Sequence, residues 1–65
     1  MEALLNTREA ARILGHAPGT LENWRTRGIG PKFIKHGSGG RVLYDPADLR
    51  EWNDAHRISS TSEGV

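Results

Sequence analysis

Apolar positions at helical spacing mark the first element of the chain. They are Ala10, Ala11, Ile13 and Leu14. Asn6, with Glu9 three residues later, has the pattern of a capping box at a helix N-terminus. Gly15 follows the stripe and is a typical stop, because glycine accepts the left-handed conformation after a last helical turn. The pattern predicts a helix between Asn6 and Gly15, with Leu4 and Leu5 folding back on it from outside.

A second helix is predicted after a turn of about three residues. Pro18 suits a first helical position, where its missing N–H costs nothing, and no helix breaker interrupts residues 20–27. Gly28 then ends the segment. Leu21 and Trp24 are three residues apart and therefore share one face. Two helices joined by a short glycine-containing turn are typical of a helix-turn-helix.

The pattern changes after Gly30-Pro31 to two short runs typical of strands, residues 32–35 and 41–44. Between them lies a loop dense in turn-forming residues, and this arrangement predicts a β-hairpin. A two-stranded hairpin is marginal by itself in water, so it must pack on the helices. The side chains expected to point inward are Phe33, Val42 and Tyr44.

A third helix is predicted to begin at Asp45-Pro46, since aspartate caps and proline occupies the first position. Leu49 and Trp52 form its apolar stripe, and it ends near Arg57. The predicted fold is mainly α with a small β-hairpin, in the order helix, helix, hairpin, helix. This is the order of a winged helix-turn-helix, with one domain over residues 1–58 and a disordered serine-rich tail over residues 59–65.

Composition limits the classes of protein that fit. The 65 residues are enough for one small domain, and there is no cysteine for a disulfide or a thiolate metal site. No apolar stretch approaches a membrane span, and the first residues lack the pattern of a signal peptide, so we expect a soluble cytoplasmic protein. The three histidines fall in different elements, and no serine has an organised base, so we expect neither an enzyme nor a cofactor.

Charge is unevenly distributed, although the net charge is only +1. Residues 23–44 contain five basic side chains and no acid, whereas residues 45–65 contain five acids and two arginines. A local basic patch is the footprint of a polyanionic partner. An ordinary solvated surface accounts for the charges alone equally well.

Five short runs in one register across residues 4–57 carry a resemblance to a known family. They are Leu4-Leu5-Asn6-Thr7-Arg8-Glu9-Ala10-Ala11-Arg12-Ile13-Leu14-Gly15, Pro18-x-Thr20-Leu21-x-x-Trp24-Arg25, Gly30-Pro31-Lys32-Phe33-Ile34-Lys35, Arg41-Val42-x-Tyr44 and Asp48-Leu49-x-x-Trp52. In these runs the chain resembles the excisionase and AlpA-like helix-turn-helix family of the MerR-like winged-helix group. The resemblance implies a small phage or mobile-element protein that binds double-stranded DNA, either directing excision beside an integrase or regulating transcription.

The second helix has the two faces that a recognition helix needs. Its apolar stripe anchors it, while the opposite side presents short polar groups to the major groove. Asn23 lies at the middle of that side and is either a bidentate partner of adenine or an ordinary surface residue. Thr20 either meets DNA or caps the helix. The chain departs from the family at Gly19, Glu22 and Asn23, where basic residues are frequent, and Glu22 would be repelled by phosphate.

The hairpin is the expected wing, with a slim glycine-rich tip and Arg41 as the strongest candidate for a minor-groove contact. A plain tight turn with flanking charges is the alternative. The candidate DNA-binding residues of helix and wing together are Pro18, Gly19, Thr20, Asn23, Arg25, Arg27, Lys35, His36, Ser38 and Arg41. Trp24 and Trp52 are expected in the core rather than as stacking platforms for single strands.

Two further expectations concern partners. A single small domain reads little DNA, so we expect cooperative binding of several copies, and the family resemblance adds DNA bending. A different class of function is a protein-interaction module in which the basic segment docks an acidic partner. DNA binding with a steep salt dependence would discriminate against that module.

Overall fold

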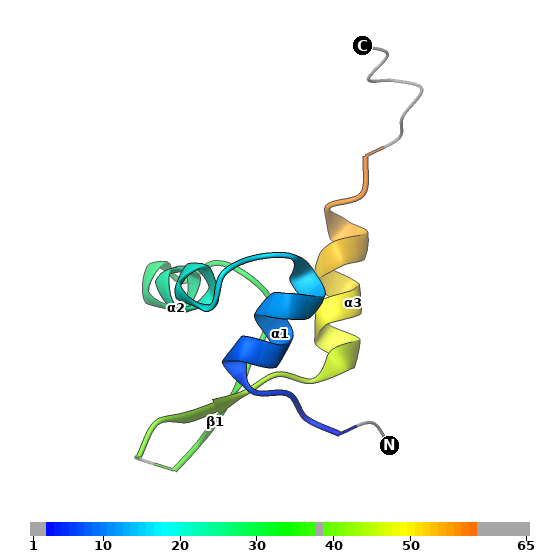
Figure 1. Ribbon diagram of the computed structural model, residues 1–65. Helices are drawn as coiled ribbons and strands as arrows, with labels where there is room; N and C mark the ends of the chain where they lie inside the picture. Colours follow the sequence, from blue (N-terminus) through cyan, green and yellow to red (C-terminus); the bar gives the residue numbers. More distant parts are fainter. Residues whose placement is uncertain (1–2, 38, 59–65) are drawn as a thin grey trace.

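The computed structural model describes residues 3–37 and 39–58. In these ranges the elements are α1 (Thr7–Leu14), α2 (Pro18–Arg27), β1 (Ile34–His36), β2 (Arg41–Leu43) and α3 (Pro46–Ala55). Figure 1 shows α1 between the other two helices, with the hairpin extending from the α1–α2 side. The fold is a small winged helix-turn-helix in the predicted order. The predicted tail, residues 59–65, lies outside the described residues.

Local cap chemistry explains where the helices begin. The Asn6 side chain accepts a hydrogen bond from the Glu9 N–H at 2.8 Å, and Glu9 Oε1 accepts one from the Asn6 N–H at 2.9 Å. This is the predicted capping box. Asp45 Oδ1 accepts a bond from the Ala47 N–H at 2.9 Å and caps α3, with Pro46 in its first turn. Gly15 ends α1 in the left-handed conformation, at φ 81°.

The capping box gives a first prediction. Asn6→Ala removes the oxygen that satisfies the Glu9 N–H, so we expect the free energy of unfolding to fall by about 1 kcal/mol. Urea denaturation followed by circular dichroism measures this change. Asn53→Ala is the matched control, because Asn53 is an exposed asparagine inside α3. Equal stabilities of the two variants would contradict the capping role.

The core lies where all the elements meet. The buried residues that form it are Ala10, Ala11, Leu21, Tyr44 and Leu49, with Leu5, Leu14, Trp24 and Val42 packed against them. The N-terminal segment joins the hairpin through Leu5, whose N–H donates to the Tyr44 carbonyl at 2.8 Å and whose carbonyl accepts from the Tyr44 N–H at 2.7 Å. Leu5 therefore folds back on the domain as predicted, while Leu4 is 38% exposed.

The hairpin differs from its prediction in two respects. The strand β1 begins at Ile34 rather than Lys32, and β2 ends at Leu43, because Tyr44 pairs with Leu5. The register pairs Ile34 with Leu43, Lys35 with Val42 and His36 with Arg41. The prediction that Phe33 points into the core is wrong: its side chain shares a face with Tyr44, at 6.3 Å between ring centroids, yet it is 41% exposed.

Candidate nucleic-acid interface

One side of α2 is polar and open to solvent. Its exposed residues are Pro18, Gly19, Glu22, Asn23, Thr26 and Arg27. The other side holds buried Leu21 and half-buried Trp24. The predicted division of this helix into an anchoring face and an exposed polar face is therefore confirmed. Asn23 lies on the open face, and Thr20 is half-buried beside it.

The N-terminus of α2 has neither a side-chain cap nor a nearby carboxylate. Its N-cap residue is Ala17, which makes no side-chain cap, and no acidic residue lies in the first turn. The interpretation of Thr20 as the helix cap therefore does not hold, since Thr20 lies inside the helix. The positive end of the helix dipole is uncompensated by a carboxylate, which makes the Pro18–Thr20 turn favourable to an anion.

Arg25 occupies a different position from the other candidate cations. Its guanidinium Nη1 donates to the Tyr44 hydroxyl at 2.7 Å and to Thr7 Oγ1 at 3.3 Å. It also lies 5.8 Å from the centroid of the Phe33 ring and 5.9 Å from that of Tyr44. Arg25 is half-buried and joins α2 to the start of α1 and to both ends of the hairpin.

A crevice of about 310 Å³ separates α2 from the hairpin. We call it the α2–wing crevice, and the residues that line it are Arg25, Thr26, Phe33, Lys35, Gly40 and Val42. Lys35 and Val42 are directly paired across the strands, so they point to the same face of the hairpin, the one toward α2. No acidic residue lines the crevice, and the open space above Phe33 explains why that ring remains exposed.

The outer face of the hairpin carries two further candidate residues of the wing. His36 and Arg41 are paired across the strands and both are exposed. Because side chains alternate along a strand, they point away from the face that Lys35 shares with Val42. Ser38, the remaining candidate of the wing, lies outside the described residues.

The structure also separates the basic surface from an acidic one. Lys32, which belongs to the basic segment in sequence, lies 3.8 Å from Glu51 of α3 rather than beside α2. That ion pair is exposed, with 77% and 68% of the two side chains accessible, and such pairs contribute at most about 1 kcal/mol. Lys35 and Arg41 remain on the hairpin, while Asp48 and Glu51 lie on α3.

The two tryptophans pack on each other between the helices. Their ring centroids are 5.4 Å apart, and His16 lies edge-on to Trp24 at 5.0 Å. Trp24 contacts the buried core, but both indoles are half-buried rather than fully enclosed. The expected core position thus holds for Trp24, which packs against the buried cluster, but not for Trp52, which stacks on Trp24 at the edge of that cluster.

Sequence reasoning missed the residues that shape the crevice. Thr26, Phe33 and Gly40 line it but were not among the candidate contacts. Helical spacing does signal Thr26, which is three residues after Asn23, and strand alternation places Phe33 on the same face as Lys35. The distance between the hairpin and α2 could not be predicted from the sequence, because it depends on contacts between residues that are far apart in the chain.

Two negative findings apply to the described part of the chain. No group of three or more histidine, cysteine, aspartate or glutamate side chains there has the arrangement of a metal site. Among its helices, none is both long enough and apolar enough to span a bilayer.

The described architecture defines the class of protein: a winged helix-turn-helix with a polar second helix and a basic wing. A family model described as a helix-turn-helix domain matches residues 4–57. The chain belongs to this helix-turn-helix domain family. Comparison with curated proteins gives no match, and comparison with solved structures gives none either.

Proposed function

We propose that the protein binds double-stranded DNA in a sequence-specific manner, with residues 1–58 as the binding domain. The observation that carries this proposal is the α2–wing crevice: it lies between the polar face of α2 and the basic hairpin, and no acid lines it. Membership of the helix-turn-helix domain family supports the same function. Proteins with this motif place the second helix in the major groove.

In this proposal the open face of α2 reads base edges. Asn23 supplies an amide that can pair with adenine in bidentate fashion, and Gly19 allows close approach of the backbone. Pro18 and Thr20 belong to the uncompensated helix N-terminus, where a phosphate is favoured. Arg27, exposed in the last turn, contacts a flanking phosphate.

The hairpin contacts the DNA backbone on both of its faces. Lys35 contacts a phosphate of the DNA strand that passes over the α2–wing crevice. Arg41, with His36 and Ser38, contacts the phosphates or the minor groove beyond the tip of the hairpin. Arg25 contributes mainly through its bonds to Tyr44 and Thr7, which fix the hairpin relative to α2. Its charge adds to the positive potential of the crevice.

The biological role proposed first is that of an excisionase, a cytoplasmic protein that binds and bends attachment-site DNA to direct an integrase. The resemblance of residues 4–57 to excisionase and AlpA-like proteins of the MerR-like group supports it. One small domain contacts little DNA, so several copies would bind adjacent sites cooperatively. The second role is a small phage or prophage transcription regulator, supported by the same resemblance. Neither role requires catalysis or a cofactor.

The test is a gel-shift titration of tiled fragments of the protein's own genomic neighbourhood at several salt concentrations. We expect discrete complexes on a few fragments and a steep decrease of affinity with salt. Fragments at an attachment region would indicate excision, and fragments at a promoter would indicate regulation. Absence of any complex at low salt would overturn DNA binding in favour of a protein-interaction module that uses the basic wing.

A matched pair of lysines sharpens this test. Lys35→Ala removes one of the two cations that line the α2–wing crevice, so the slope of log affinity against log salt becomes shallower by about 0.9. Lys32→Ala removes another exposed lysine, one that faces Glu51 on α3, and the slope stays unchanged. Equal slopes for the two variants would mean that the crevice does not hold a phosphate.

A further inference from the structure

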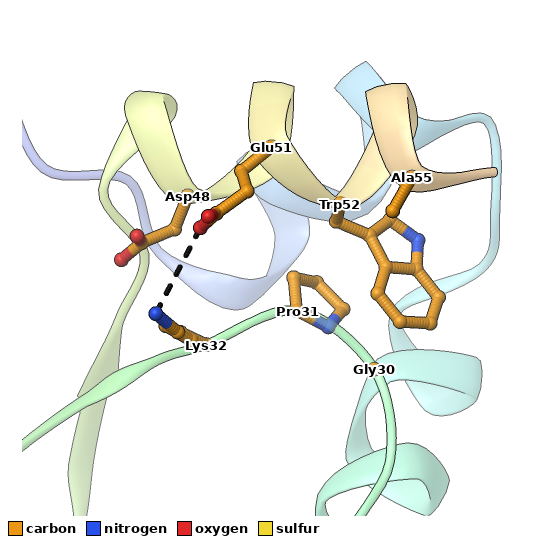
Figure 2. A pocket seen from close by; sticks show the side chains of 7 residues that line it. All are labelled: Gly30, Pro31, Lys32, Asp48, Glu51, Trp52 and Ala55. Carbon is orange, nitrogen blue, oxygen red and sulfur yellow. Dashed lines mark ion pairs between the residues drawn. The ribbon is translucent and has the colours of Figure 1, made fainter. Parts of the chain in front are cut away.

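A second groove lies on α3, apart from the α2–wing crevice. It has a volume of about 290 Å³, and its lining residues are Gly30, Pro31, Lys32, Asp48, Glu51, Trp52 and Ala55. We call it the α3 groove. Figure 2 shows the Pro31 ring and the Trp52 indole facing the same space beneath the helix, with the Asp48 and Glu51 carboxylates toward the other end.

Packing from below holds the walls of the α3 groove in place. Gly30 has a φ of +92°, and an added Cβ there would lie 3.0 Å from Trp24 Cβ, so the loop passes directly over that indole. Pro31 is buried. Trp52 packs between Trp24, at 5.4 Å, and His56, at 3.9 Å between ring centroids. The groove is therefore preformed, as is usual for binding sites.

The size and the chemistry of the α3 groove limit which ligands can bind in it. At about 290 Å³ the α3 groove lies at the lower end of the volumes of ligand sites, roughly 300 Å³, and it has room for one or two side chains. Its floor is apolar, from Pro31, Trp52 and Ala55, and its rim carries two carboxylates, Asp48 and Glu51, with one ammonium, Lys32, beside Glu51. The Lys32 ammonium, 3.8 Å from a Glu51 carboxylate oxygen, shows that a cation fits at this rim.

We propose that the α3 groove docks a partner protein through a short segment in which an aliphatic side chain is flanked by lysine or arginine. The aliphatic group packs mainly on Trp52, since Pro31 is buried, while the flanking cations meet Asp48 and, in competition with Lys32, Glu51. The carboxylates repel a phosphate backbone, so DNA is not the occupant. Figure 1 shows α1 between α2 and α3. No residue that lines the α3 groove also lines the α2–wing crevice, so one molecule can bind DNA and the partner segment at different surfaces.

The test uses blocked tripeptides as probes and nuclear magnetic resonance of the whole protein without DNA. We expect a lysine–leucine–lysine peptide to cause saturable shifts of the Trp52 indole N–H and of the Lys32 and Ala55 amides. A glutamate–leucine–glutamate peptide causes no such shifts. Salt lowers the affinity for the basic peptide, because the charges that pair are exposed to solvent. Equal shifts with both peptides, or shifts elsewhere only, would overturn the proposal.

Two variants of α3 distinguish binding in the groove from a general effect of added charge on this helix. Ala55→Arg places bulk and positive charge in the groove at an exposed position and lowers the affinity for the basic peptide on the order of tenfold. Asn53→Arg makes the same charge change at an exposed position outside the groove and leaves binding within about twofold. Equal losses in the two variants would refute the groove as the docking site.

Self-association is the remaining outcome to distinguish. If a second copy occupied the α3 groove, sedimentation of the free protein would show a concentration-dependent mass that Ala55→Arg abolishes, and this result would overturn the proposal. Both α3 variants retain the DNA affinity of the parent protein if the proposed DNA-binding function is correct. Peptide binding is measured without DNA, so failure of either hypothesis leaves the other intact.

Discussion

Arg25→Met lowers the free energy of unfolding by about 2 kcal/mol, the scale of a lost hydrogen bond from a charged donor. The guanidinium donates to the hydroxyl of Tyr44, a residue only 1% exposed, and lies near the faces of two rings. Methionine preserves most of the stem that packs at the domain centre while removing the donor. Small domains are stable by roughly 0.1 kcal/mol per residue, so this loss is a large fraction of the total.

The same substitution weakens DNA binding by a route that differs from the loss of a phosphate contact. If Arg25 fixes the hairpin relative to α2, Tyr44→Phe reduces DNA affinity in parallel, although the Tyr44 side chain is buried. The salt dependence of affinity then stays the same in Arg25→Met. A slope that is shallower by about 0.9, with Tyr44→Phe unaffected, would instead indicate that Arg25 binds a phosphate.

A double-mutant cycle supplies the stability control. The free energies of unfolding of Arg25→Met, Tyr44→Phe and the double variant give the coupling between the two side chains. We expect a coupling of about 1 kcal/mol or more, since the pair is in direct contact at 2.7 Å. Additive effects within about 0.3 kcal/mol would contradict the bond as the reason for the loss.

The role of Arg25 could not be predicted from the sequence, whereas most local features of the fold could. Helix ends follow from neighbouring residues: Asn6 with Glu9, Asp45 before Pro46, and the stop at Gly15. These caps, the presence of the hairpin and the element order were predicted correctly because each depends on residues a few positions apart, whereas the strand ends and the orientation of Phe33 were not. The polar face of α2 was also predictable, since helical spacing alone assigns it.

Contacts between remote residues were not predictable in the same way. Arg25 donates hydrogen bonds to Thr7 and Tyr44, which are 18 and 19 positions away in the chain. No local pattern indicates that a basic side chain makes such remote contacts. Lys32 was counted with the basic segment, but the loop carries it to Glu51. The exposure of Phe33 depends on the gap between hairpin and α2, which alternation along a strand does not set. The assignment of individual DNA contacts stays a prediction.

Gly30→Ala has the second large expected effect, a loss of about 3 kcal/mol in the free energy of unfolding. Two costs combine: the left-handed backbone, at φ +92°, costs an L-residue roughly 1–2 kcal/mol, and the new methyl group overpacks the site by about 1 kcal/mol or more. The added Cβ would lie 3.0 Å from both Cβ and Cε3 of Trp24, and that indole is packed against Trp52.

Gly28→Ala separates the two costs, because Gly28 is also left-handed, at φ +74°, but has nothing within 4 Å of an added Cβ. We expect it to lose only the backbone share, about 1 kcal/mol. Denaturation followed by tryptophan fluorescence measures both variants and reports on Trp24 directly. Equal losses would show that the indole moves aside freely, in which case the loop over Trp24 would not hold the α3 groove in shape.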